Sequence, residues 1–110
     1  MIELRVKTKK FFWTKHAQEK MRYYQLVESR LKRIFRHPQR LEEGVAENTI
    51  AAMQRVGSPK HKYEIWIMYQ VKGEIIKIIS AWRYPGKTKP GDRVPIPPEI
   101  MEELGINLKR

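Results

Sequence analysis

The sequence contains no cysteine and no long apolar run. Without cysteine the fold cannot rely on disulfides, and thiolate chemistry is excluded. No apolar stretch reaches the ~20 residues that a membrane-spanning helix needs, and the first residues lack the apolar segment of a signal peptide. These absences predict a soluble, cytoplasmic protein that makes no membrane contact.

Metal-binding patterns are also missing. The three histidines, His16, His37 and His61, are scattered along the chain without cysteine or closely spaced carboxylates. Structural and catalytic metal sites combine several such ligands at short spacing. We therefore expect neither a metal nor a cofactor.

Acidic residues are scarce in the first third of the chain. Residues 1–40 contain twelve Lys and Arg against three Glu, so they carry +9 of the formal net charge of +11. A helical region that concentrates positive charge is typical of a surface that meets a polyanion such as nucleic acid. Proteins from hot habitats are also rich in charged residues, so a purely structural protein remains an alternative.

The length of 110 residues and a hydrophobic content of 41% predict one folded domain over 1–110. Residues 2–7 alternate between apolar and charged side chains, as in a half-buried strand, and 11–13 form a second extended segment. Thr14 is a suitable N-cap for a first helix. A second helical run ends at Pro38. The sequence leaves open whether the two runs are separate helices, because neither Gly nor Pro separates them.

The second half of the chain has the period of strands. After an acidic turn at 41–44, we expect three antiparallel strands, an irregular loop and a short helix, at 45–55, 63–71, 74–84, 85–98 and 99–104. Lys72-Gly73 is the hairpin turn between the last two strands, and Gly105 ends the helix. The predicted fold class is α+β: a strand, two helices, a three-stranded antiparallel meander and a short C-terminal helix.

The hairpin at 63–84 is apolar on both faces. In its first strand, alternation places Trp66 and Met68 opposite a row of five apolar residues: Tyr63, Ile65, Ile67, Tyr69 and Val71. In its second strand, Ile76, Ile78 and Trp82 are predicted to oppose Ile75, Ile79 and Ala81. One face is expected to pack on the helices. The other needs the C-terminal tail, a second subunit or a ligand to cover it.

The first helical segment resembles a known group of domains. Residues 14–21, Thr-Lys-His-Ala-Gln-Glu-Lys-Met, are similar to the His-Ala-x-x-Arg-Met opening of small uncharacterised domains related to the RelE/ParE-like toxin superfamily. The resemblance spans about 11–85, with 86–110 as a loop and tail. It continues at 35–38, Phe-Arg-His-Pro, which occupies the Asn/Asp-Pro-like end of the second helix. Two positions depart from the group: Lys20 replaces an Arg, and Tyr24-Gln25-Leu26 replaces Arg-Gly-Ile.

This resemblance implies an RNA-directed, toxin-like protein, a metal-independent ribonuclease acting on messenger RNA at the ribosome and normally held by an antitoxin. RelE-type ribonucleases place Arg and Tyr near the end of the chain, as Arg83 and Tyr84 stand here. RNA cleavage needs a base, an acid and a cation for the phosphorane. His16 or Tyr84 would transfer protons, and Arg83 would hold the phosphate. Alternatively, His16 only bonds the neighbouring strand and Arg83 is a surface residue.

Nucleic-acid contact is predicted for a basic helical face and for aromatic side chains that could stack a base. The residues are Lys15, Lys20, Arg22, Arg30, Arg33, Arg36, Trp66, Trp82, Lys87 and Lys89. A solvated helix face and a buried Trp82 are the structural alternatives. A non-catalytic nucleic-acid-binding or protein-interaction domain of the same fold is the alternative function.

The tail resembles a second family over a short span. Residues 94–106, with Ile-Pro-Pro-Glu-Ile followed by Leu-Gly-Ile, are similar to a segment of AbrB-type DNA-binding antitoxins. An ordinary connection from a strand to a helix, with Pro in the first helical turn, would have the same sequence. We interpret the segment as a packing tail, whose Ile100, Leu104 and Ile106 are available to cover the second sheet face.

Overall fold

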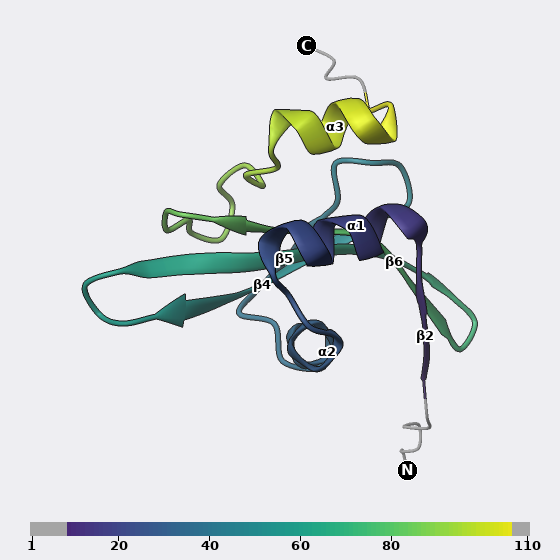
Figure 1. The fold of residues 1–110 in the computed structure, drawn as a ribbon, viewed down its shortest axis with the longest axis horizontal. Helices are drawn as coiled ribbons and strands as arrows, with labels where there is room; N and C mark the ends of the chain where they lie inside the picture. Colours follow the sequence, from purple (N-terminus) through teal and green to yellow (C-terminus); the bar gives the residue numbers. More distant parts are fainter. Residues whose placement is uncertain (1–8, 107–110) are drawn as a thin grey trace.

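The computed structural model describes residues 9–106 (Figure 1). Within them the fold is α+β, with three helices and one five-stranded mixed sheet. The elements in chain order are β2 (Lys10–Trp13), α1 (Lys15–Tyr24), α2 (Glu28–Arg36), β3 (Arg40–Glu43), β4 (Ile50–Gly57), β5 (Lys62–Lys72), β6 (Ile75–Tyr84) and α3 (Pro98–Leu104). The predicted strand at 2–7 lies outside the described residues.

The sheet extends the predicted meander on both sides. Its order is β2-β6-β5-β4-β3, with β3 to β6 antiparallel and β2 parallel to β6. The acidic turn expected at 41–44 is wrong, because residues 40–43 form strand β3 and the turn to β4 follows it. β3 begins at Arg40, whose side chain is buried and bonds Glu42, Thr88 and the carbonyl of Asp92. Two of these partners are distant in sequence, so local pattern could not predict them.

Helices α1 and α2 are separate, which the sequence left open. Thr14 caps α1 as predicted: its Oγ1 accepts a hydrogen bond from the Ala17 N–H at 3.0 Å and donates one to the Ile79 carbonyl at 3.1 Å. α1 ends where Gln25 adopts the left-handed conformation with φ of 59°. Gln25 therefore does here what Gly usually does at the end of a helix.

A β-bulge in β6 changes which side chains share a face. Tyr69 pairs with Ile78, but Met68 pairs with Ser80, so the register shifts at Ile79. A bulge adds one residue and reverses the alternation beyond it. Ala81 therefore joins the core beneath the helices and Trp82 faces the other side. The sequence placed Ile76 and Ile78 correctly on the face opposite Ile79, but it exchanged Ala81 and Trp82 for this reason.

The C-terminal tail covers the second face of the sheet. In Figure 1, α2 lies on one side of the sheet and α3 on the other. Ile100 of α3 is fully buried against Met53, Trp66, Met68 and Trp82, with Leu104 and Ile106 packed on the same cluster. The sequence allowed the C-terminal tail, a second subunit or a ligand to cover this face, and in the structure the tail covers it. No helix in residues 9–106 is long and apolar enough to cross a membrane.

Candidate nucleic-acid interface

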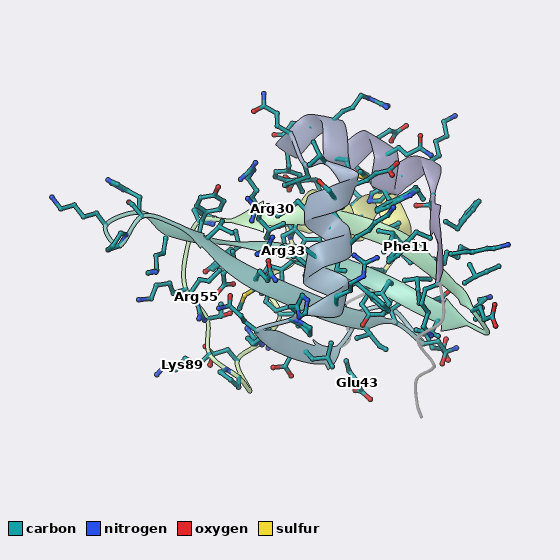
Figure 2. All side chains as sticks on the ribbon, turned by 90° about the horizontal axis from the view of Figure 1, so that it is seen from below. Phe11, Arg30, Arg33, Glu43, Arg55 and Lys89 are labelled. Carbon is teal, nitrogen blue, oxygen red and sulfur yellow. The ribbon has the colours of Figure 1, made fainter. Side chains whose placement is uncertain are left out.

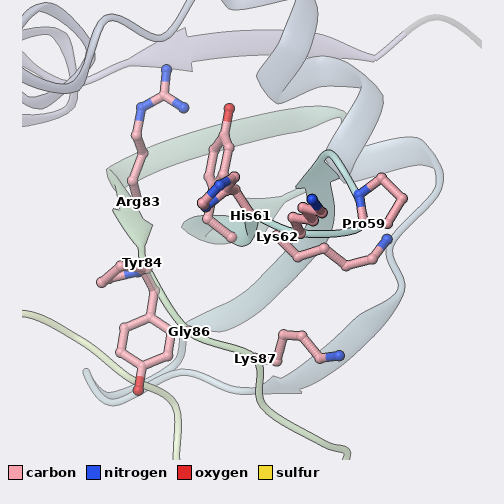
Figure 3. Close-up of a pocket in the computed structure, with 10 residues that line it drawn as sticks. Pro59, His61, Lys62, Arg83, Tyr84, Gly86 and Lys87 are labelled. Atoms are coloured by element: carbon pink, nitrogen blue, oxygen red, sulfur yellow. The ribbon is translucent and has the colours of Figure 1, made fainter.

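A cavity of about 860 Å³ lies where β5 begins and β6 ends (Figure 3). This volume falls in the range of about 300–1,000 Å³ that is usual for ligand pockets. The turn before β5 forms one wall, and the end of β6 with the following loop forms the other. The lining residues are Pro59, Lys60, His61, Lys62, Tyr63, Arg83, Tyr84, Pro85, Gly86 and Lys87.

The antiparallel pairing of β5 with β6 brings these walls together. Glu64 pairs with Tyr84, so residues just before Glu64 face residues just after Tyr84. Gly57 begins the turn with φ of +101°, and a Cβ there would lie 2.3 Å from the carbonyl oxygen of His61. Only Gly tolerates that approach at a positive φ. The turn therefore presents 60–62 to the end of β6.

Arg83 is held rigidly between α1 and the cavity. Its Nε donates to the Tyr24 carbonyl at 2.8 Å and its Nη2 to the Gln25 carbonyl at 3.3 Å, so it satisfies carbonyls at the end of α1. The guanidinium carbon also lies 5.1 Å from the centre of the Tyr63 ring. A guanidinium has five N–H donors. The two described bonds use two of them, which leaves three for a ligand.

Tyr84 is positioned by Gly86. A Cβ on Gly86 would lie 2.7 Å from Cε2 of the Tyr84 ring and 3.1 Å from its hydroxyl oxygen. Such a contact is too short for a real side chain, so Gly86 lets the ring lie close to the loop backbone. The direction of the phenol depends on this close approach.

A buried carboxylate fixes the loop that carries Lys87. Glu64 is fully buried and accepts hydrogen bonds from the Thr88 N–H at 2.5 Å, the Thr88 hydroxyl at 2.9 Å and Trp66 Nε1 at 2.9 Å. Arg55 Nη2 lies 3.7 Å from the same carboxylate and donates to the Thr88 carbonyl at 2.6 Å. Because Thr88 follows Lys87 directly, this network sets where that wall of the cavity lies.

The charge of the cavity has one sign. Its lining includes four cationic side chains, Lys60, Lys62, Arg83 and Lys87, together with His61, and no Asp or Glu. Lys60, His61, Lys62 and Lys87 are exposed. In a concave site such like charges raise the local concentration of anions. The arrangement suits a phosphate-bearing ligand.

The predicted site residues divide between this cavity and other places. Arg83, Tyr84 and Lys87 line the cavity together, whereas His16 does not. His16 Nε2 shares a hydrogen bond of 2.9 Å with the buried Ser80 hydroxyl, and Nδ1 lies 3.7 Å from Glu103. It thus bonds the neighbouring strand, the structural alternative considered for it. Lys89 also lies outside the lining, and its backbone N–H donates to Asp92 at 2.8 Å.

Burial lowers the pKa of His16 below its ordinary value of 6.5. The carboxylate of Glu103 opposes this effect on the pKa, and the ammonium of Lys20 adds to it. Lys20 itself lies 2.8 Å from Glu103, so its charge is paired. His16 and Lys20 of α1 both lie close to Glu103 of α3, so they hold the two helices together.

The tryptophans are not available to a ligand. Trp66 and Trp82 are fully buried, and their rings stack on each other with centres 6.2 Å apart. The expectation that either stacks a base is corrected, because both rings belong to the core beneath α3. Tyr63 and Tyr84 are the aromatic side chains that line the cavity.

The cations of α2 point in two directions. Arg30 and Arg33 lie on one side of α2, the side toward Arg55, and Phe11 lies on the other (Figure 2). Arg36 and Lys32 approach the Phe11 ring at 6.0 and 5.4 Å from its centre. Arg30 and Arg33 therefore share a face that Arg36 does not. Lys15 and Arg22 are exposed on α1 and line no part of the cavity.

No protein-family model, curated protein or solved structure matches this chain. The function must therefore be inferred from the site.

Lys60, His61 and Lys62 are the basic cavity residues that the sequence did not propose as site residues. The signal was present in the predicted hairpin. Counting back from the Lys72-Gly73 turn places 60–62 opposite residues that follow Tyr84. This register places three basic residues beside Arg83 and Tyr84.

Proposed function

We propose that this protein binds RNA in the cavity between 59–63 and 83–87 and cleaves it as a toxin-like, metal-independent ribonuclease. The observation that carries the proposal is the lining itself: four cations, an imidazole and two phenols, with no carboxylate. Cations neutralise phosphate, and aromatic rings stack bases without regard to sequence. The proposal also accords with the resemblance of residues 14–21 to the RelE/ParE-like superfamily. We also propose that the chain has the RelE/ParE-like fold and that an antitoxin partner binds it.

The chemistry is an attack of the RNA on itself. The 2′-hydroxyl oxygen bonds to the adjacent phosphorus, and the imidazole of His61 takes its proton. The bond from phosphorus to the 5′-oxygen breaks, and that oxygen takes the phenolic proton of Tyr84. The products are a 2′,3′-cyclic phosphate and a 5′-hydroxyl. Lys87 stabilises the negative charge that accumulates on the phosphorane oxygens. Arg83 leaves β6 in the direction opposite to Tyr84 (Figure 3), so it does not share this phosphate.

His61 replaces His16 in this assignment because it lines the cavity with Arg83 and Tyr84. Imidazole is the side chain most often used to move protons near neutral pH. His16 is engaged by Ser80 and Glu103 instead.

The test is a titration of the purified protein with a labelled single-stranded RNA, followed by a search for cyclic-phosphate products in the presence of a chelator. Wild type should bind and cleave. Lys87→Gln should weaken binding and lower the salt slope by about 0.7, the value for one phosphate contact on a single strand. Lys89→Gln, an equal charge change outside the lining, is the matched control. Absence of RNA binding at low salt would refute the proposal.

The second candidate function is non-catalytic RNA binding at the same cavity. The observation that favours it is that Arg83 already bonds two carbonyls of α1, which is a structural task. Binding without any cyclic-phosphate product, in wild type as in the His61→Gln variant, would select this alternative.

A further inference from the structure

A second, smaller cavity adjoins the first and shares two of its residues. It has a volume of about 140 Å³ and is lined by Gln25, Leu26, Val27, Arg30, Tyr63, Ile65 and Arg83. Tyr63 and Arg83 line the large cavity as well. The Arg83 guanidinium carbon lies 5.1 Å from the centre of the Tyr63 ring, and we call this pair, which lines both cavities, the Arg83–Tyr63 partition.

The size of the small cavity limits what it can hold. At about 30 Å³ for each water of liquid, it has room for roughly five waters. It is well below the range of about 300–1,000 Å³ of pockets for whole small molecules. A phosphodiester group fits this space, whereas a complete nucleotide needs the larger one.

The chemistry of the small cavity also suits a phosphate. Arg30, exposed in the first turn of α2, and Arg83, fixed by α1, both line it, and no Asp or Glu does. No ion pair within residues 9–106 includes Arg30. Two guanidinium groups that face one space can bind a phosphate with several N–H donors.

We propose that the small cavity is a second phosphate site, in which Arg30 and Arg83 bind the phosphodiester next to the one in the large cavity. This inference rests on the proposed function and specifies its substrate: an RNA strand with at least two successive phosphates that passes over the Arg83–Tyr63 partition. A mononucleotide fills only the large cavity. Arg30 is then a residue that recognises strands and not single nucleotides.

The experiment compares two ligands on the full chain. One is a single-stranded RNA hexamer with 2′-O-methyl riboses, which cannot cleave itself because its 2′-oxygen carries no proton. The other is a nucleoside 5′-monophosphate. Each is titrated into wild type, Arg30→Gln and Arg36→Gln across a range of salt. Arg36→Gln removes the same charge from the same helix but on the side toward Phe11.

The expected result is a selective effect. Arg30→Gln should reduce the salt slope for the hexamer by about 0.7 and leave mononucleotide affinity as in wild type, whereas Arg36→Gln should keep the hexamer slope near the wild-type value. Equal effects of the two variants on the hexamer, or a loss of mononucleotide affinity in Arg30→Gln, would overturn the second site. In those cases RNA binding itself would remain, so the proposed function would stand. If neither ligand binds wild type, both proposals fall.

Discussion

His16 and His61 lie in opposite surroundings within one small protein. His16 is half-buried at the start of α1, bonded to Ser80 and close to the Lys20–Glu103 pair. His61 is exposed in a cavity whose charged lining is entirely basic. The neighbours of a histidine, and not the histidine itself, therefore decide whether it can contact a ligand. Four predictions test this contrast.

The largest effect is expected on catalysis. His61→Gln should lower the cleavage rate by about 10²–10⁴-fold, the usual contribution of a general acid or base, and change RNA affinity little. His16→Gln should leave the rate unchanged. Single-turnover cleavage at saturating protein separates the two variants. Equal losses in both, or a loss only in His16→Gln, would reverse the assignment.

A second contrast concerns the carboxylates that support the two regions. Glu64 is fully buried and accepts hydrogen bonds from Thr88 and Trp66, so Glu64→Ala should lower the free energy of unfolding by about 1–3 kcal/mol for each buried donor left without an acceptor. Glu103 is 46% exposed, and its pair with Lys20 should contribute less than about 1 kcal/mol. Urea unfolding of Glu64→Ala and Glu103→Ala measures both. Similar losses in the two variants would contradict the difference in burial.

The third prediction tests the position of Tyr84. Gly86→Ala should displace the ring, because the added Cβ would lie 2.7 Å from Cε2. A misplacement of about 1 Å can lower a rate by roughly 10²-fold. The cleavage rate of Gly86→Ala should therefore approach that of Tyr84→Phe. A wild-type rate in Gly86→Ala combined with a low rate in Tyr84→Phe would show that the loop can move to accommodate the methyl group.

The smallest effect is the pH dependence of stability. Since burial lowers the pKa of His16 in the folded state, the unfolded chain binds a proton first as pH falls. The contribution of His16 is complete above about 6.5, the ordinary pKa, and is lost as pH falls through the lower folded pKa. Urea unfolding at several pH values should show that His16→Gln removes part of this loss. An identical pH profile in wild type and variant would contradict the shift.

The parts of the fold that depend on local pattern were predictable. The Thr14 cap, the Lys72-Gly73 turn, the strand at 63–71 and the final helix all follow from residues close in sequence. Strand β3 was not predictable, because Arg40 is buried through partners near residue 90. The bulge at Ile79 was missed as well, since an unbroken alternation of apolar residues gives no sign of an extra residue.

The candidate site was predictable in part. Arg83, Tyr84 and Lys87 were singled out from their place in the chain, and they do line one cavity. Their neighbours 60–62 required the strand register to be followed to its end. Trp66 and Trp82 were misjudged because the choice between a buried and an exposed tryptophan depends on α3, whose packing position no local pattern contains.

The most direct test of the proposed interface is NMR of the His16 and His61 imidazole rings during titration with the 2′-O-methyl RNA hexamer. The resonances of His61 should move with saturation as the RNA binds, and those of His16 should stay in place. If the RNA binds while His61 does not respond, or if His16 responds in its place, the cavity between 59–63 and 83–87 is not the RNA site.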